Sequence, residues 1–166
     1  MTLTLIVLRH AKSGWGDPSL PDHDRTLTER GHRDAAAIGA WLAAHGHVPD
    51  LILSSDAART VQTIADVMGG IGQDVQTQLL PMLYNASADT IRRVIRKQTA
   101  KTLLVCAHNP GIGHLASELL SNPPSHAGFD DYPTAATAVI YFDVASWAGI
   151  ETGNCLSFII PADLKP

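Results

Sequence analysis

The sequence is poor in cysteine, in long apolar runs and in excess basic charge, and each shortage narrows the class of protein that it encodes. Its two cysteines, Cys106 and Cys155, stand far apart and form no C-x-x-C pair, so we expect reduced thiols in a cytoplasmic protein. No stretch approaches the ~20 apolar residues of a membrane span, and "MTLTLIVL" runs into Arg9 without the pattern of a secretory signal. The net charge of −4 argues against a nucleic acid or a membrane surface as the partner.

Several catalytic and cofactor-binding motifs are missing as well. There is no H-E-x-x-H and no paired Cys/His spacing, so we expect no metal site. There is no G-x-x-x-x-G-K-[ST] loop, and "GGIGQD" lacks the preceding strand and following helix of a dinucleotide loop, so we expect no cofactor. The absence of G-x-S-x-G argues against an acyl hydrolase. Cys106 is followed six residues later by Ile112 instead of an arginine, so it is not the nucleophile of a tyrosine phosphatase.

Strand-like apolar runs alternate with helical segments along the 166 residues, a length that fits one domain with a sizeable core. We expect strands at residues 3–8, 51–54, 75–78, 102–107, 137–144 and 155–160, and helices at residues 26–46, 56–69, 87–97 and 112–120. This alternation predicts a single α/β domain over residues 1–166, a three-layer α/β/α sandwich with a mostly parallel central sheet. The last two strands are expected to pair as an antiparallel edge.

Local signals mark where the helices begin and end. Thr26 and Glu29 fit a capping box for the first helix, and Thr28 is a second possible cap. Gly69-Gly70 predicts the end of the second helix, and Ser87 is a cap for the third.

Polar residues follow three of the predicted strands at their carboxyl ends. Arg9-His10 ends the first strand, Ser54-Ser55 the second, and His108-Asn109 the central apolar strand. Arg59 lies one helical turn beyond the second strand. Because functional sites of such sheets gather at the carboxyl ends of the strands, we expect these side chains to meet at one edge.

Two arginines and two histidines at one edge suit a phosphoryl group. The guanidinium groups of Arg9 and Arg59 match phosphate oxygens with paired donors. An imidazole with an ordinary pKa of ~6.5 is largely neutral at pH 7 and is able to attack phosphorus, which gives a phosphohistidine intermediate. Lys12 and Ser13, in the loop after the first strand, are able to add donors.

These motifs resemble the histidine phosphatase superfamily, with its phosphoglycerate-mutase-like fold, and within it the small SixA-like phosphohistidine phosphatases. The resemblance is carried by "LRHAKS", "DHDRTLTERGHRDA", "SSDAARTVQT", "LYNAS", "VCAHNPGI", "YPTAATAVIYFD" and "GNCLSFIIPADL", and it covers nearly the whole chain. It implies His10 as the nucleophile, with Arg9, Arg59 and His108 as the catalytic and phosphate-binding partners. Lys12, Ser13 and Asn109 are further candidates for phosphate binding. The resemblance implies a reaction without metal or nucleotide cofactor.

The sequence departs from much of the superfamily in one respect, the carboxylic acid that protonates the leaving oxygen. At one of its two usual positions the sequence reads "LLPMLYNAS", which contains no carboxylate. At the other, directly after His108, it has Asn109. Because an alkoxide is a poor leaving group without an acid, we expect a preference for P–N bonds or activated phosphates. The expected substrate is a protein-borne phosphohistidine or a small phosphorylated compound. Four aspartates elsewhere in the sequence could still reach the site: Asp17, Asp22, Asp24 and Asp56.

Other interpretations of the same residues stay open at this point. The functional alternatives are an ester phosphatase for small metabolites and a phosphate-binding domain without turnover. His10 could be a hydrogen-bonded loop residue, and His108 could cap the "NPGI" turn. Arg59 could pair with an aspartate of its own helix, Asp56 or Asp66. The remaining structural interpretations are an Asp24-Arg25 ion pair and solvated Lys12 and Ser13. Trp15 and Tyr84 could lie at the rim of the pocket or have packing roles.

Overall fold

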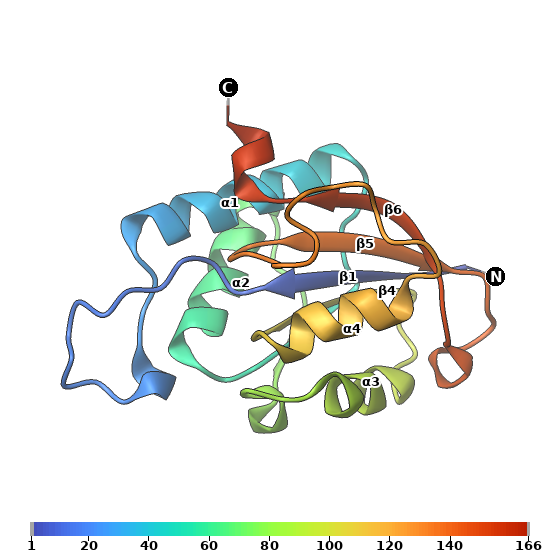
Figure 1. Cartoon of the computed structure of the whole chain (residues 1–166), viewed down its shortest axis with the longest axis horizontal. Helices are drawn as coiled ribbons and strands as arrows, with labels where there is room; N and C mark the ends of the chain where they lie inside the picture. Colours follow the sequence, from blue (N-terminus) through green and yellow to red (C-terminus); the bar gives the residue numbers. More distant parts are fainter. Residues whose placement is uncertain (1, 166) are drawn as a thin grey trace.

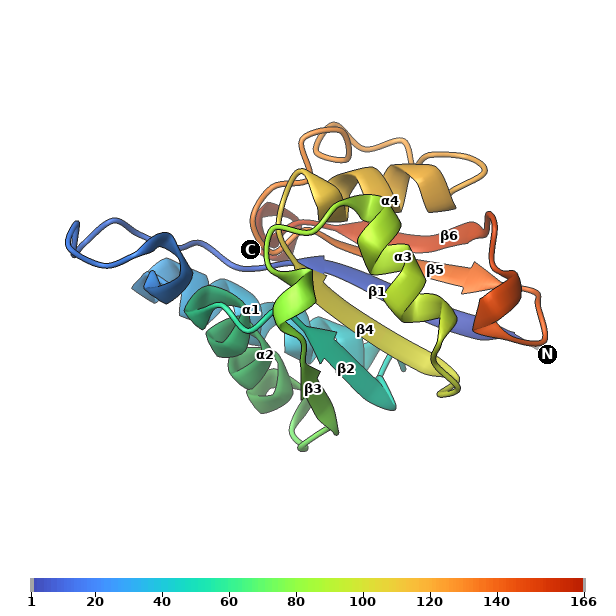
Figure 2. The same cartoon turned by 90° about the horizontal axis from the view of Figure 1, so that it is seen from below.

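The computed structural model describes residues 2–165 and contains one six-stranded sheet with helices on both faces (Figures 1 and 2). The strand order is β3-β2-β4-β1-β5-β6. The strands are β1 (Leu3–Arg9), β2 (Leu51–Ser54), β3 (Thr77–Leu79), β4 (Thr102–Ala107), β5 (Thr137–Phe142) and β6 (Asn154–Ile159). The first four strands are mutually parallel, whereas β5 runs antiparallel to both β1 and β6. The predicted fold class, including the antiparallel edge, is therefore confirmed.

Strand β1 lies inside the sheet, between β4 and β5, and its side chains alternate between two cores. Leu5 and Val7 contribute to one core, and Ile6 and Leu8 to the other. All four are fully buried, as expected for a strand covered on both faces. This burial explains why the segment is an unbroken apolar run and why its first charged residue, Arg9, comes where the strand ends.

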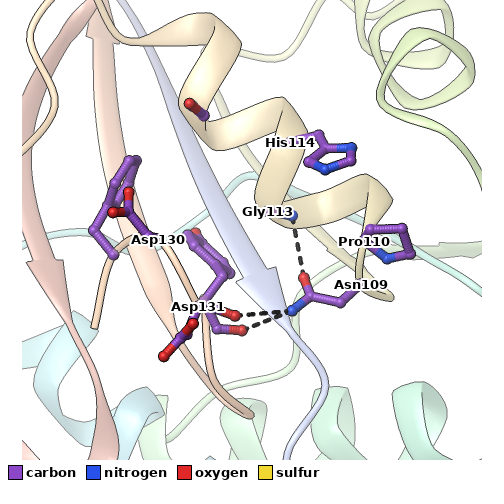
Figure 3. Close-up of a pocket in the computed structure, with 9 residues that line it drawn as sticks. Asn109, Pro110, Gly113, His114, Asp130 and Asp131 are labelled. Carbon is purple, nitrogen blue, oxygen red and sulfur yellow. Dashed lines mark hydrogen bonds between the residues drawn. The ribbon is translucent and has the colours of Figure 1, made fainter. Parts of the chain in front are cut away.

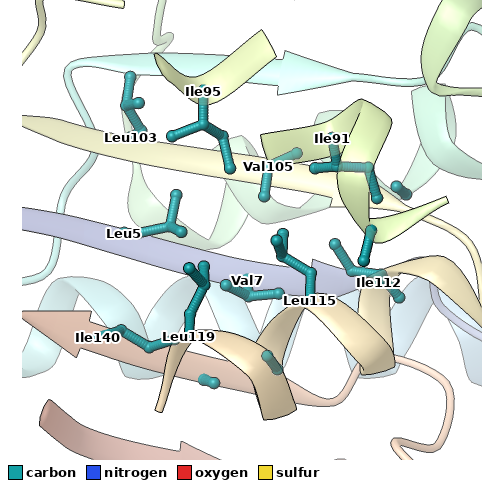
Figure 4. Packing of buried hydrophobic residues seen from close by; sticks show 14 of the residues in the cluster. Leu5, Val7, Ile91, Ile95, Leu103, Val105, Ile112, Leu115, Leu119 and Ile140 are labelled. Atoms are coloured by element: carbon teal, nitrogen blue, oxygen red, sulfur yellow. The ribbon is translucent and has the colours of Figure 1, made fainter. Parts of the chain in front are cut away.

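The helices form one pair on each face of the sheet. Helices α1 (Glu29–Ala44) and α2 (Ala58–Ile71) pack against each other on one face. Helices α3 (Ala88–Arg96) and α4 (Gly111–Leu119) cover the opposite face. Figure 4 shows this second core, where Leu115 and Leu119 of α4 lie among residues of α3 and the central strands. Among the described residues, no helix is long and apolar enough to cross a membrane.

The first two helices differ from the predicted boundaries for identifiable reasons. Thr28 caps α1, since its side chain accepts a hydrogen bond from the Gly31 N–H; the alternative capping box at Thr26 was wrong. Helix α2 continues through Gly69-Gly70 and ends at Ile71, with Gly72 as its C-cap in a left-handed conformation (φ of 89°). A Cβ atom on Gly70 would lie 2.1 Å from the Ala36 carbonyl oxygen, so this glycine permits close packing on α1 and does not end the helix.

Other boundaries moved by a few residues. The strand predicted at residues 75–78 is Thr77–Leu79, and it pairs only with β2, at the edge of the sheet. The strand predicted at residues 137–144 ends at Phe142, and α4 begins at Gly111, one residue earlier than predicted. The last strand is Asn154–Ile159 instead of residues 155–160. Both cysteines are free thiols, Cys106 buried and Cys155 partly so.

Candidate active site

A cavity of about 270 Å³ lies where β1, β2 and β4 end. Its lining includes all seven residues expected at a site. The lining residues are Arg9, His10, Lys12, Ser13, Trp15, Arg25, Arg59, Asn85, His108, Asn109 and Thr134. The sheet thus brings together side chains that are up to about a hundred positions apart in the sequence, because parallel strands end at the same edge.

His10 is held in one orientation and one protonation state. Its side chain is buried, and Nδ1 lies 2.8 Å from the Ala11 carbonyl oxygen. A carbonyl oxygen only accepts hydrogen bonds, so Nδ1 carries the proton and donates. Burial lowers the pKa of His10 to about 3, and the nearby charges of His108, Arg9 and Arg59 act in the same direction. The ring is therefore neutral at pH 7, with a free lone pair on Nε2.

Arg9 and Arg59 each keep a buried donor without a partner. Nη1 of Arg9 donates to the Tyr132 carbonyl oxygen at 3.2 Å. Both terminal nitrogens of Arg59 donate to Asp22, at 2.7 Å to its backbone oxygen and 3.0 Å to its carboxylate. The Nε atoms of both arginines are buried without a hydrogen-bond partner. Because buried donors are almost always satisfied, these two N–H groups indicate a place for an anion.

His108 lies beside His10 and is hydrogen-bonded to Ser55, the residue that directly follows β2. The two ring centroids are 5.3 Å apart, and Nε2 of His108 lies 2.9 Å from Oγ of Ser55. Nδ1 of His108 is buried without a partner. Burial, followed by the charge of Arg59, lowers the pKa of His108 to about 4. The two histidines are therefore both neutral at pH 7.

Asp22 is the centre of a hydrogen-bond network. From the sequence it was only one of four aspartates that could reach the site. Its carboxylate accepts from Arg59, from Nε of Arg25 at 3.1 Å and from the Tyr84 hydroxyl. The Tyr84 hydrogen bond, together with the two arginines, lowers the pKa of Asp22 to about 2. Asp22 is therefore ionised and is not a proton donor near pH 7.

This network corrects two structural readings. Arg59 pairs with Asp22 from the loop before α1 and not with an aspartate of its own helix. Arg25 also pairs with Asp22, because the short helix over Asp22–Asp24 turns that carboxylate towards it. One feature of the sequence pointed to Arg25, its position in the same loop as Trp15. In the structure the Arg25 guanidinium stacks over the Trp15 ring, with Cζ 3.8 Å from the ring centroid.

The remaining predicted residues have different surroundings. Lys12 and Ser13 line the cavity from the loop after β1. Asn109 uses its amide within the protein: Nδ2 donates to the carbonyls of Asp131 and Tyr132, and Oδ1 accepts from the Gly113 N–H. Trp15 is 69% exposed and lines the cavity, so of the two roles suggested for it the place at the rim is the one observed.

The electrostatic character of the cavity follows from its lining. Arg9, Lys12, Arg25 and Arg59 contribute positive charge, and no Asp or Glu is among the lining residues. The site therefore combines a neutral, oriented imidazole with unpaired N–H donors. Such a combination is able to bind a tetrahedral oxyanion and to attack it.

Comparison with known proteins gives a consistent result. Residues 5–85 match the histidine phosphatase superfamily (branch 1). An uncharacterized protein of Mycobacterium tuberculosis is 35% identical over 88% of this chain and 93% of its own length. An uncharacterized chloroplastic protein of Arabidopsis thaliana is 36% identical over 69% of this chain, which spans 58% of that relative. A solved structure from Nakamurella multipartitia, proposed to be the phosphohistidine phosphatase SixA, is 31% identical with a TM-score of 0.79 and 97% of each chain covered.

Proposed function

Because the chain belongs to the histidine phosphatase superfamily (branch 1), we propose that it is a phosphatase that transfers a phosphoryl group to His10 and then to water. The observation that carries this proposal is the His10 ring, whose Nδ1–H donates to the Ala11 carbonyl while Nε2 is left unprotonated in a cation-lined cavity. The family makes a phosphatase the natural first hypothesis, and the geometry supports His10 as its nucleophile.

The first step forms one bond and breaks another. Nε2 of His10 attacks phosphorus, a P–N bond to the ring forms, and the bond to the leaving group breaks. The guanidinium groups of Arg9 and Arg59, which line the cavity, donate to the equatorial oxygens, over which charge is spread in phosphoryl transfer. Water then attacks phosphorus, a P–O bond forms as the P–N bond to Nε2 breaks, and the proton lost by the water goes to solvent or to the inorganic phosphate that is released. His10 regains its neutral form, with Nδ1 protonated and Nε2 free.

We further propose that P–N bonds are the preferred substrates, as in a phosphohistidine. The nitrogen of a P–N bond is basic enough to take up a proton from solvent before the bond breaks, and it then departs as a neutral amine or imidazole. An ester oxygen is not, and it needs a proton from an acid as it leaves. The cavity lining contains no carboxylate, and Asp22, which binds Arg25 and Arg59 of that lining, has a pKa lowered to about 2 by Tyr84 and the arginines. General-acid help is worth about 10²–10⁴-fold in rate, so its lack penalises simple phosphate esters most.

The nucleophile is tested by intact mass after brief mixing with phosphoramidate. We expect the wild type to gain one acid-labile phosphoryl group and His10→Ala to gain none. His45→Ala, which removes an exposed histidine outside the cavity, is the matched control and should behave as the wild type. A wild type that neither gains the group nor releases phosphate would favour a binding domain without turnover.

The bond preference is tested separately, by comparing kcat/KM for a phosphohistidine peptide and for an unactivated sugar phosphate. We expect the peptide to be favoured by at least about 100-fold, the lower end of the general-acid contribution. Comparable values would contradict the preference and favour an ester phosphatase.

A further inference from the structure

A second cavity, of about 320 Å³, adjoins the candidate active site on the side of α4. It lies between α4 and the loop that precedes β5, and Asn109 lines both cavities. Figure 3 shows His114 and Pro110 on the α4 side, with Asp130 and Asp131 on the loop across from them. The side chain of Asn109 therefore lies between the two cavities.

The lining of this cavity combines apolar surface with negative charge. Phe129 and Tyr132 are buried and form its apolar part, and Asp130 and Asp131 are exposed. No lysine or arginine lines the cavity. Within residues 2–165, neither carboxylate forms a salt bridge; the ten pairs found involve other aspartates and Glu118. The two negative charges are thus available to a molecule outside the chain.

The acidic loop is tied directly to the residues that surround His10. The Tyr132 carbonyl accepts from Nη1 of Arg9 at 3.2 Å and from Nδ2 of Asn109 at 3.0 Å. The neighbouring Asp131 carbonyl accepts from the same amide nitrogen at 3.2 Å. These three hydrogen bonds hold the backbone of the acidic loop beside Arg9 and Asn109.

The two adjoining cavities have opposite charge. The first is lined by Arg9, Lys12, Arg25 and Arg59 without a carboxylate, and the second by two aspartates without a lysine or arginine. A ligand that fills both would carry a phosphoryl group and, one side chain away, a positive charge on an apolar stem. Lysine and arginine side chains have this form, because their methylene groups pack on apolar surface while the charged end reaches a carboxylate.

We propose that the second cavity is a subsite for a lysine or arginine side chain that neighbours the phosphorylated residue of a protein substrate. The proposal rests on the proposed function of His10, and it adds a specificity that a small phosphorylated metabolite would not use. Pairs between exposed charges are individually weak, but two carboxylates on one loop give a lysine or a bidentate arginine a second partner, which strengthens the contact. We expect a preference of about fivefold in kcat/KM.

The test uses phosphohistidine peptides of equal length in which a single lysine is moved through the positions on both sides of the phosphohistidine, the other positions being alanine. We expect at least one position to raise kcat/KM about fivefold in the wild type. The double variant Asp130→Asn with Asp131→Asn should lose this preference and keep its rate with phosphoramidate, which is too small to reach the subsite. Asp74→Asn, an exposed aspartate beyond the end of α2, should retain the preference.

The outcomes separate the two proposals. Equal kcat/KM for lysine and alanine peptides, or a preference that survives in the double variant, would overturn the subsite while phosphoramidate turnover upholds the phosphatase. Failure of the wild type to react with either donor would overturn the phosphatase and the subsite with it. A normal phosphoramidate rate in the double variant also shows that it is folded.

Discussion

At the scale of single residues, burial prepares His10 for the role of nucleophile that we propose for it. In water an imidazole is partly protonated near neutral pH, and a protonated ring has no lone pair to attack phosphorus. Burial and the surrounding cations keep His10 neutral, while the Ala11 carbonyl selects the tautomer with Nε2 free. The same features that make the ring reactive make its protonation unfavourable in the folded state.

This conflict makes the stability of the protein depend on pH. The pKa of His10 is about 3 in the folded state, below the ~6.5 of an unfolded chain, so the unfolded state takes up a proton first as pH falls. The stabilising effect of neutral His10 is complete above pH ~6.5 and is lost progressively towards pH ~3. Between pH ~7.5 and ~5.5 this amounts to about 1.4 kcal/mol.

We therefore expect His10→Asn to lose about 1.4 kcal/mol less than the wild type in the free energy of unfolding when pH falls over that interval. Urea unfolding at the two pH values, for both proteins, measures the difference. Parallel losses in the two proteins would mean that His10 is protonated as readily in the folded chain as in the unfolded one.

The sequence predicted which residues line the cavity better than it predicted the hydrogen bonds and ion pairs that hold them in place. Arg9, His10 and His108 directly follow or end strands, so their convergence depends only on the sheet being parallel. Asp22 has no such position: it reaches Arg59 across 37 residues and Tyr84 across 62. Contacts of this kind depend on the path of an irregular loop, for which the sequence has no periodic signal.

At the scale of elements, the close approach of α1 and α2 depends on glycine. A Cβ atom on Gly70 would lie 2.1 Å from the Ala36 carbonyl oxygen, and one on Gly39 would lie 2.1 Å from that of Val67. Nothing lies within 4 Å of a Cβ atom on Gly69. Adjacent glycines of one helix thus have opposite roles, one required by packing and the other free.

Substituting alanine at each position separates these roles. We expect Gly70→Ala to destabilise the protein by about 1–3 kcal/mol, since the two helices must move apart. Gly69→Ala should be neutral or stabilising by up to about 1 kcal/mol, because alanine favours helix over glycine. Urea unfolding of both variants measures the effects, and a Gly70→Ala variant as stable as Gly69→Ala would show that the helices separate without loss.

The elements themselves were predictable where their signals are periodic and failed where tertiary packing decides. The run at residues 102–107 and the cap at Ser87 match β4 and α3 as observed. The glycine pair at residues 69–70 resembles a helix end in sequence, yet its second member exists to accommodate a neighbouring helix that the local pattern does not reveal. The strand at Thr77–Leu79 is short and exposed on two of its three residues, so its apolar signal is weak.

At the scale of the whole molecule, the chain has a net charge of −4 but gathers positive charge around one cavity. A local site of this kind should bind an oxyanion in preference to chloride, and binding to the folded state alone stabilises it. Arg9 and Arg59, whose Nε atoms have no hydrogen-bond partner among the described residues, are the residues that we expect to bind the oxyanion.

Inorganic phosphate should therefore raise the melting temperature. At about 100 times its Kd a ligand contributes about 2.7 kcal/mol, which corresponds to roughly 5–10 °C for a domain of this size. Arg9→Ala should lose most of this shift, and Arg33→Ala, which removes an exposed arginine of α1, should keep it. Thermal unfolding in phosphate and in chloride of equal ionic strength measures the effect; identical melting temperatures in the two salts would contradict a specific site.

The place of β1 in the sheet also bears on how the protein is made. The ribosome produces the strand that leads to His10 before either of its neighbours, β4 and β5, which end at residues 107 and 142. Until both have emerged, the apolar side chains of β1 have no sheet to join. Ser55 and His108 likewise wait for the same assembly before they reach the histidine. His10 is thus synthesised well before the residues that complete the cavity around it, so a nascent chain that already carries His10 does not yet carry the assembled site.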